Sequence, residues 1–320
     1  MANSFLKAEK IANFSLGVLE REIVLPALVW RDAGGSFRGA AGDTITIRVP
    51  ARTTARTRSL RGARQYNATV SGTDVAGAGI ITMDELTETS VDVTLDTAAY
   101  SAVPITDEEL TLDIQDFGRQ VAEPQVRAIA EAIEDAVAAE MTGATYKHTI
   151  SVDDPGKIYD KLVDAWTTLN KENVPTSERR LVVGADFEGV LLKSDDLHRV
   201  DRSGSDSALR DANIGRIAGF PEVVVSNALP SNVAFAFHRT AYVLNLQAPA
   251  VPEGATYGAS RSAYGLAMRW IRDYDFRNVQ DRSLFDVYFG TNHVADGAPE
   301  EGSSDPSFVR AVKLELVEGS

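Results

Sequence analysis

Residues 51–79 constrain the fold most, because this segment cannot bury a core of its own. It consists mostly of Arg, Thr, Ser, Gly and Ala, with almost no large apolar side chain except Leu60 and Tyr66. Burial of such residues gains too little free energy to offset the entropy lost on ordering the chain. The composition therefore predicts a long projecting loop that becomes ordered only against another surface.

Two segments of alternating polarity flank this loop. Residues 43–50 alternate Ile45, Ile47 and Val49 with Thr and Arg, and residues 91–96 alternate Val and Leu with Asp and Thr. Alternation with a period of two is typical of half-buried strands. We expect the two strands to pair and to close an extended hairpin around the loop.

Charges of opposite sign occupy different parts of the chain. Seven arginines lie between residues 38 and 64, against one acid, Asp43. Residues 107–140 contain ten acids and two bases, Arg119 and Arg127. The net charge of −14 disfavours non-specific binding to DNA, which requires a basic surface.

Helices are predicted at the N-terminus and in the acidic segment. Apolar positions in residues 4–25 indicate an amphipathic helix that ends before Pro26. Thr106 is suited to cap a helix with three acids in its first turn, and Pro124 to restart it. Apolar residues then recur every three or four positions up to Met141. The pattern predicts a long amphipathic helix that rests one face on a sheet.

The second half of the chain has the pattern of a separate α/β unit. We expect helices at 157–171 and 186–193, and strands at 180–183, 222–226, 233–237 and 241–246 that form a central sheet. Strands at 266–274 and 282–289 would then complete the first core, which makes the first domain discontinuous. A last strand at 307–317 follows an acidic linker, with Phe308, Val312, Leu314 and Leu316 on one face.

Signatures of catalysis and of cofactor binding are missing from the sequence. There is no cysteine, so disulfides and thiolate metal sites are excluded, and no glycine-rich nucleotide motif or nucleophile elbow is present. The four histidines are far apart and are interpreted as surface or hydrogen-bonded residues. No apolar run suits a membrane span or a secretory signal, so cytosolic synthesis is expected.

Several sequence segments, in this order along the chain, resemble those of one protein family. They are MANSFLKAEKIANFSLGVLEREIVLPALVWRD, GDTITIRVP, ITDEELTLDIQDFGRQVAEP, and GRIAGFPEVVVSNALP followed by AFHRTAYVL. Together with the predicted organisation they resemble the major capsid proteins of tailed bacteriophages, which have the Hong Kong 97-like fold. The resemblance implies an α+β fold with five parts: N-terminal arm 1–43; extended-loop hairpin 44–95, its loop at about 50–90; peripheral domain 96–148 and 261–292, with spine helix 107–141; axial domain 149–260; linker and C-terminal strand 293–320.

The resemblance also implies assembly rather than catalysis. Subunits would form hexamers and pentamers that close into an icosahedral shell around a double-stranded DNA genome, without sequence-specific DNA binding, a membrane, a cofactor or a metal. Expected partners are copies of the chain itself, a scaffolding protein, a portal and a decoration protein, in a virion assembled in the bacterial cytoplasm. The open alternatives are an encapsulin-like cargo shell and an α/β enzyme that uses Asp and His from separate loops.

The separated charges suggest how neighbouring subunits make contact. We expect the arginine-rich loop of one subunit to be steered onto the acidic spine helix of the next. A nucleic-acid-binding loop is the alternative, disfavoured because aromatic stacking partners are few. The candidate contact residues are Arg52, Arg56, Arg58, Arg61, Arg64, Asp113, Asp116, Glu123, Glu131, Glu134 and Asp135.

Two departures from the family pattern carry further expectations. Some relatives link a loop lysine covalently to a neighbouring subunit, but this chain has no lysine between Lys10 and Lys147. Stability is therefore expected from non-covalent interleaving, helped by the last strand, which could add to a neighbour's sheet or dock a decoration protein. Because the predicted arm starts at the first residues, with no room before it for a long fused scaffolding segment, a separate scaffolding protein is expected.

Overall fold

The computed structural model describes residues 11, 14–15, 23–33, 44–49, 89–109, 116–194, 216–221, 223–255, 257–263, 266–297 and 306–317. The chain divides into two compact units, residues 47–91 and the remainder. The extended loop with its five candidate arginines, most of the N-terminal helix, and Asp113 lie outside the described residues. Predictions made for those residues remain predictions.

A six-stranded sheet forms the larger part of the fold. Its order is β1 (Trp30–Ala33), β9 (Tyr242–Gln247), β12 (Gln280–His293), β11 (Leu266–Asp275) and β10 (Tyr257–Ala263), and β4 (Thr97–Thr106) also pairs with β12. The β1–β9 pair is parallel and the others are antiparallel. The predicted strands at 266–274 and 282–289 are confirmed and are longer than expected, whereas β1, β4 and β10 were not predicted.

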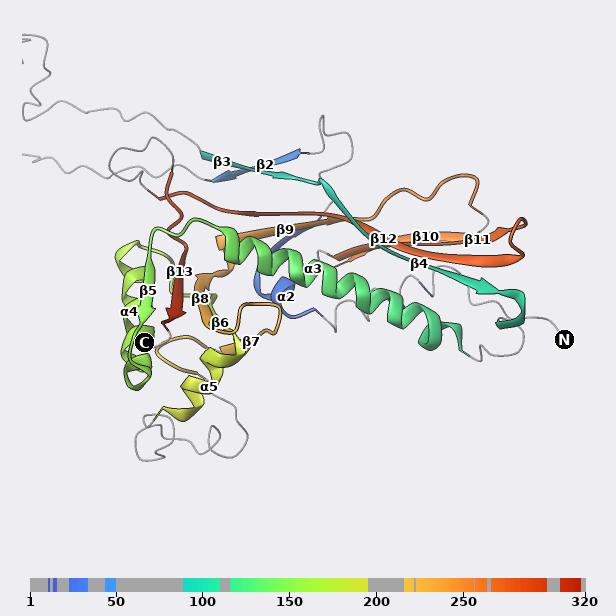
Figure 1. The fold of residues 1–320 in the computed structure, drawn as a ribbon. Helices are drawn as coiled ribbons and strands as arrows, with labels where there is room; N and C mark the ends of the chain where they lie inside the picture. Colours follow the sequence, from blue (N-terminus) through green and yellow to red (C-terminus); the bar gives the residue numbers. More distant parts are fainter. Residues whose placement is uncertain are drawn as a thin grey trace, which may run out of the picture. The chain divides into compact units, whose positions relative to one another are not determined.

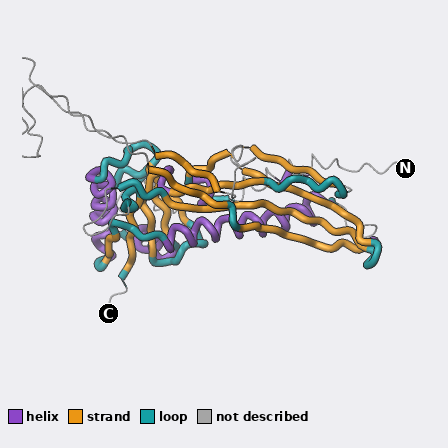
Figure 2. Tube along the Cα trace, turned by 90° about the horizontal axis from the view of Figure 1, so that it is seen from above, coloured by secondary structure: helices purple, strands orange, loops and turns teal. Residues whose placement is uncertain are grey.

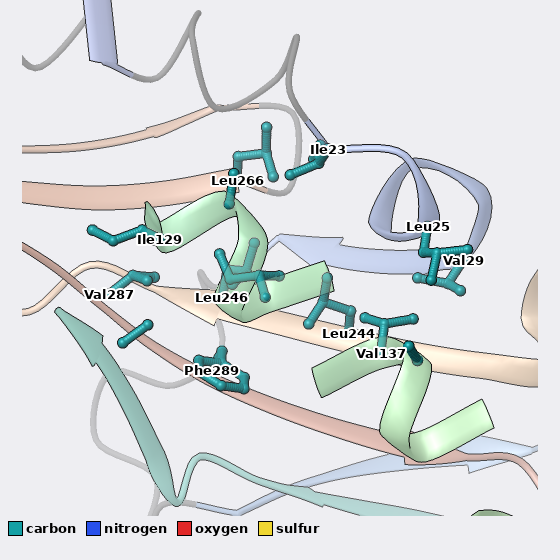
Figure 3. Packing of buried hydrophobic residues seen from close by; sticks show 14 of the residues in the cluster. Ile23, Leu25, Val29, Ile129, Val137, Leu244, Leu246, Leu266, Val287 and Phe289 are labelled. Carbon is teal, nitrogen blue, oxygen red and sulfur yellow. The ribbon is translucent and has the colours of Figure 1, made fainter. Parts of the chain in front are cut away.

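The long helix α3 (Glu123–Gly143) lies along this sheet (Figures 1 and 2). Pro124 is in its first turn, as predicted, and the predicted apolar stripe is buried: Val126, Ile129, Ile133, Val137 and Met141. Figure 3 shows Ile129 and Val137 of α3 with aliphatic side chains of β9 and β12, including Leu244, Leu246 and Val287. Burial of these side chains, at about 1.5–3 kcal/mol each, is the main force that holds the helix on the sheet.

The sequence predicts a helix from residue 107 that restarts at Pro124, and the structure places the restart earlier, at residue 117. Residues 107–108 are helical, but residues 110–115 are not described, and Gly118–Ala122 form a π-helix, η2, before α3 begins. A separate short helix that was not predicted, α2 (Leu25–Leu28), contains Pro26 in its first turn. Proline is tolerated there because the first turn of a helix needs no donor at that position.

A five-stranded sheet forms the second core. Its order is β5 (Thr149–Val152), β13 (Ala311–Leu316), β8 (Val233–His238), β6 (Arg179–Val183) and β7 (Val223–Val225). The 3-10 helix η3 (Pro155–Lys157), α4 (Ile158–Lys171) and α5 (Ala185–Lys193) connect its strands, and both α-helices contribute apolar side chains to a buried cluster with the sheet. The two helices and strands β6, β7 and β8 confirm the predicted α/β pattern.

The structure corrects two strand assignments. Residues 242–247 form β9 and belong to the six-stranded sheet, not to the sheet that contains β8, because the 3-10 helix η4 (Arg239–Ala241) redirects the chain between them. The last strand, β13, pairs with β5 and β8 inside the subunit. Both edges of β13 are therefore occupied, which removes the expected addition of this strand to a neighbour's sheet. Phe308 packs in the cluster with α3, while Val312 and Leu314 pack in the other cluster.

Strands β2 (Thr44–Val49) and β3 (Thr89–Thr94) pair in a two-stranded sheet, as the alternation predicted. At the end of β3, Val93 is buried and Asp92 and Thr94 are exposed, and Asp96 after the strand is also exposed. The side chains of β2 lie outside the described part, so their predicted alternation of burial is untested.

The two sheets of the main unit meet at a cluster of aromatic residues. The ring of Tyr146, just after α3, stacks on Phe235 of β8 at 5.6 Å and lies 5.3 Å from Phe308. The hydroxyl of Tyr242, at the start of β9, is hydrogen-bonded to that of Tyr146. Burial raises the pKa of both tyrosines, so neither carries a charge in this cluster.

Candidate assembly surface on the long helix

The exposed side of α3 carries small side chains between charged ones. Ala128, Ala132 and Ala139 are exposed, as are Glu131 and Asp135. Small residues on the outer side let another polypeptide approach the helix backbone closely. The carboxylates supply the charge that would orient it.

Glu134, one turn from Glu131, faces into the subunit. One carboxylate oxygen accepts a hydrogen bond from the backbone N–H of Val24 at 3.1 Å, and the other accepts one from Ser226 Oγ at 3.1 Å. Glu134 therefore ties the segment before α2 and the segment after β7 to the middle of α3.

These three acids line one cavity of about 540 Å³. Its other lining residues are Val24, Arg127, Ala130, Val225, Ser226, Asn227 and Ala228. Three carboxylates against one guanidinium give the cavity a negative charge. A site of this charge and size favours an arginine or lysine side chain from outside the subunit.

The other two described candidate acids, Asp116 and Glu123, form contacts with residues close to them in the sequence. Asp116 accepts hydrogen bonds from the N–H groups of Gly118 at 3.0 Å and Arg119 at 3.4 Å, in the manner of an N-cap. Glu123 forms an ion pair of 3.0 Å with Arg127, four residues further on. Neither acid lines the cavity, so the structure gathers Glu131, Glu134 and Asp135 and leaves Asp116 and Glu123 outside the site.

Val24 and Ser226 are site residues that sequence reasoning missed. Their partner, Glu134, is 110 residues from Val24 and 92 residues from Ser226. No local pattern marks contacts at that separation. The convergence of Glu131, Glu134 and Asp135 does have a local signal, because spacings of three and four residues lie on one side of a helix.

A second cavity of about 570 Å³ lies where the β3–β4 connection, α3 and β12 meet. Asp92, Asp96 and Glu140 are its acids, and three threonines and Asn292 add polar groups. The side-chain amide of Asn292 donates to the carbonyl of Asp92 at 2.6 Å, which fixes the β3 end beside β12.

Each of the three described histidines has a hydrogen-bond partner, as predicted. His148 contacts Glu172 at 2.7 Å, His293 contacts Glu140 at 2.8 Å, and His238 contacts Thr240 at 2.8 Å. Within the described ranges no three His, Asp or Glu side chains are grouped so that they could hold a metal ion. No helix among these residues is long and apolar enough to cross a bilayer.

Comparison with solved structures identifies the fold. The structure from Mycobacterium phage Che8 matches with a TM-score of 0.61 and 18% identity, over 91% of this chain and 90% of that one. The capsid of Ralstonia phage GP4 matches with a TM-score of 0.58 and 12% identity, over 92% and 88%. A virus-like particle from Pyrococcus furiosus matches with a TM-score of 0.50 and 12% identity, over 96% and 98%. The chain thus has the predicted Hong Kong 97-like fold of shell-forming proteins.

A family model gives the more specific assignment. The model described as phage capsid protein matches residues 87–291, more than half of the chain. The chain belongs to this family and is a structural protein of the bacteriophage shell, located in the capsid of the virion. A comparison with curated protein sequences gives no significant match.

Proposed function

We propose that this chain is the major capsid protein that assembles into hexamers and pentamers and closes an icosahedral shell around double-stranded DNA, without catalysis. The family match over residues 87–291 is the observation that carries the proposal. The domain boundaries given by the resemblance, the scaffolding, portal and decoration partners, and assembly in the host cytoplasm belong to the same proposal. The net charge of −14 supports a shell that encloses DNA without binding it tightly.

The acidic cavity on α3 is the proposed receptor for the extended loop of a neighbouring subunit. Five arginines lie within residues 52–64. A guanidinium can form two parallel hydrogen bonds with one carboxylate, and Glu131 and Asp135 are exposed. A single exposed ion pair contributes only about 0–1 kcal/mol, but the contact repeats at every subunit of a closed shell. Such weak contacts are reversible, so misplaced subunits can dissociate during assembly.

Charge reversal and charge exchange test this contact. Changing Arg56, Arg58 and Arg61 to Glu should abolish shells in electron micrographs of the protein expressed with its neighbouring genes, while the subunit stays folded. Introducing Glu131→Lys and Asp135→Lys into the same chain should restore shells in part, because the pairing is inverted. Replacing the three arginines with Lys is the matched control, since it keeps the charge and loses the bidentate geometry. Normal shell yield from the reversed chain would contradict the proposed contact.

A cargo shell of the encapsulin kind is the second candidate. The match to the virus-like particle from Pyrococcus furiosus, which covers 96% of this chain, favours it. Particles purified from the native source separate the two proposals. A shell that contains double-stranded DNA supports the phage capsid, and a shell that contains a protein cargo and no genome supports the compartment.

A further inference from the structure

In the described part of the chain, three connections join the two sheets, and a histidine lies at one end of each. The chain passes from α3 to β5, from β8 through η4 to β9, and from β12 to β13 (Figure 1). His148 directly precedes β5, His238 is the last residue of β8, and His293 is the last residue of β12. Imidazole is the side chain whose charge changes near neutral pH. The junction of the sheets therefore contains three groups that can respond to acid.

Backbone hydrogen bonds link the three connections to one another. The N–H of Lys147 donates to the carbonyl of Phe308 at 3.3 Å, which links the first connection to the third. The N–H of His238 donates to the carbonyl of Arg310 at 3.0 Å, which links the second connection to the third. A bond that is lost at one connection therefore weakens a junction that the other two still hold together.

His238 caps η4 and so fixes the second connection. Its Nδ1 accepts a hydrogen bond from the backbone N–H of Thr240 at 3.2 Å. Because a backbone amide only donates, Nδ1 carries a lone pair and the buried ring is neutral. Arg310, in the third connection, donates to the Thr240 hydroxyl and, at 3.4 Å, to the Thr240 carbonyl. A proton on Nδ1 would place a donor against the N–H of Thr240 and break the cap.

The surroundings of His238 oppose a proton on its ring. Burial lowers the pKa of His238, and the positive charges of Arg310 and Arg179 lower it further. The charge of Glu178 and a hydrogen bond to the backbone of Ser177 act in the opposite direction. As the pH falls below the ordinary value for histidine, the open form of the second connection takes up a proton before the closed form does. Acid therefore favours the open form.

The other two histidines contact carboxylates and respond differently. His148 Nε2 lies 2.7 Å from the carboxylate of Glu172, and His293 Nδ1 lies 2.8 Å from that of Glu140. A proton on either ring converts a neutral hydrogen bond into a charge-assisted one, which is stronger. Mild acid therefore leaves the first and third connections closed while it weakens the second.

We propose that the second connection is an acid-sensitive switch at the junction of the two sheets. Protonation of His238 releases Thr240 and opens η4, while His148 and His293 keep the other two connections closed. All these contacts lie within one subunit, so the inference does not rest on the proposed function.

Hydrogen–deuterium exchange of the full-length, unassembled chain at pH 7.5 and pH 5.5 tests the switch, with rates corrected for the intrinsic effect of pH. If only the open form binds the proton, with the ordinary pKa of about 6.5, opening increases about tenfold at pH 5.5. Residues 239–242 should lose protection by that factor, while residues 144–148 and 293–295 should not. His238→Asn should abolish the acid effect, because the Asn oxygen caps Thr240 and does not titrate. His148→Asn is the matched control and should retain the effect.

Three results would overturn the switch. Equal protection of residues 239–242 at both pH values is the first, and an undiminished acid effect in His238→Asn is the second. Equal loss of protection in all three connections is the third, because the whole junction would then respond instead of η4. The comparison among connections uses the unaltered chain, so it decides the question even if His238→Asn does not fold.

Discussion

A buried hydrogen-bond network anchors the start of α3 on the sheet and allows a quantitative prediction. Gln125 is 2% exposed, and its amide donates to the carbonyls of Ser101 at 3.0 Å and Ser283 at 3.1 Å. Its oxygen accepts from Ser283 Oγ at 3.0 Å, and that hydroxyl accepts from Trp270 Nε1 at 3.0 Å. One side chain thus connects α3 to β4, β12 and, through Ser283, β11.

Replacement of Gln125 with Met keeps the length of the side chain and removes its three hydrogen bonds, while the bond from Trp270 to Ser283 remains. Three neutral hydrogen bonds at about 0.5–1.5 kcal/mol each give a loss of about 3 kcal/mol in the free energy of unfolding. Gln125→Ala also leaves a cavity and should cost about 1–2 kcal/mol more. The double variant Gln125→Met with Ser283→Ala should lose less than the sum of the single losses, because the two residues share a bond.

Urea unfolding of unassembled subunits, followed by circular dichroism, measures these losses. Gln120→Met is the matched control, because Gln120 is exposed and its bond to the N–H of Asp116 at 3.0 Å is open to solvent. The control should lose less than about 1 kcal/mol, since water replaces an exposed hydrogen bond. Equal losses for Gln125→Met and Gln120→Met would refute the assignment of this network as the anchor.

Two further predictions concern a close approach and a titrating group. Gly290→Ala should destabilise the subunit by about 1–3 kcal/mol in the same urea assay, since its Cβ would lie 2.0 Å from the carbonyl oxygen of Thr94, whereas Gly254→Ala, with nothing within 4 Å, should not. Burial and the charge of Arg310 lower the pKa of His238 below its ordinary 6.5, so the unfolded chain binds the proton first and stability should fall as the pH drops below that value. His238→Gln should reduce the difference in melting temperature between pH 7.5 and pH 5.5, and an unchanged difference would contradict this.

The parts of the fold that were predictable from sequence are those with a local period. The apolar stripe of α3 repeats every three to four residues, and β11 and β12 carry bulky aromatic side chains that end in the same core. The alternation around Val93 likewise marked β3. In each of these elements, the residues that are buried can be predicted from residues close by in the sequence.

Sheet membership could not be predicted, because it depends on pairing at long range. β8 and β9 are both almost wholly buried, and even Asn245 of β9 is buried, so exposure to solvent does not distinguish one sheet from the other. β9 joins the six-stranded sheet through Leu244 opposite Arg31, more than 200 residues upstream. For the same reason the sequence led us to expect that β13 pairs with a neighbouring subunit, because its partners β5 and β8 within the subunit are distant in sequence.

The acids of α3 show how the structure divides one charged face into two roles. Glu134 uses both oxygens within the subunit, on Val24 and Ser226, so its loss breaks contacts that hold three chain segments together. Glu131 and Asp135 have no partner in the described ranges and line the same cavity. Substitution of Glu134 should therefore lower the stability of the subunit itself, whereas substitution of the other two should leave it unchanged. In the sequence the three carboxylates cannot be told apart. The contacts of Glu134 show that this residue maintains the cavity, whereas Glu131 and Asp135 remain available to a neighbouring subunit.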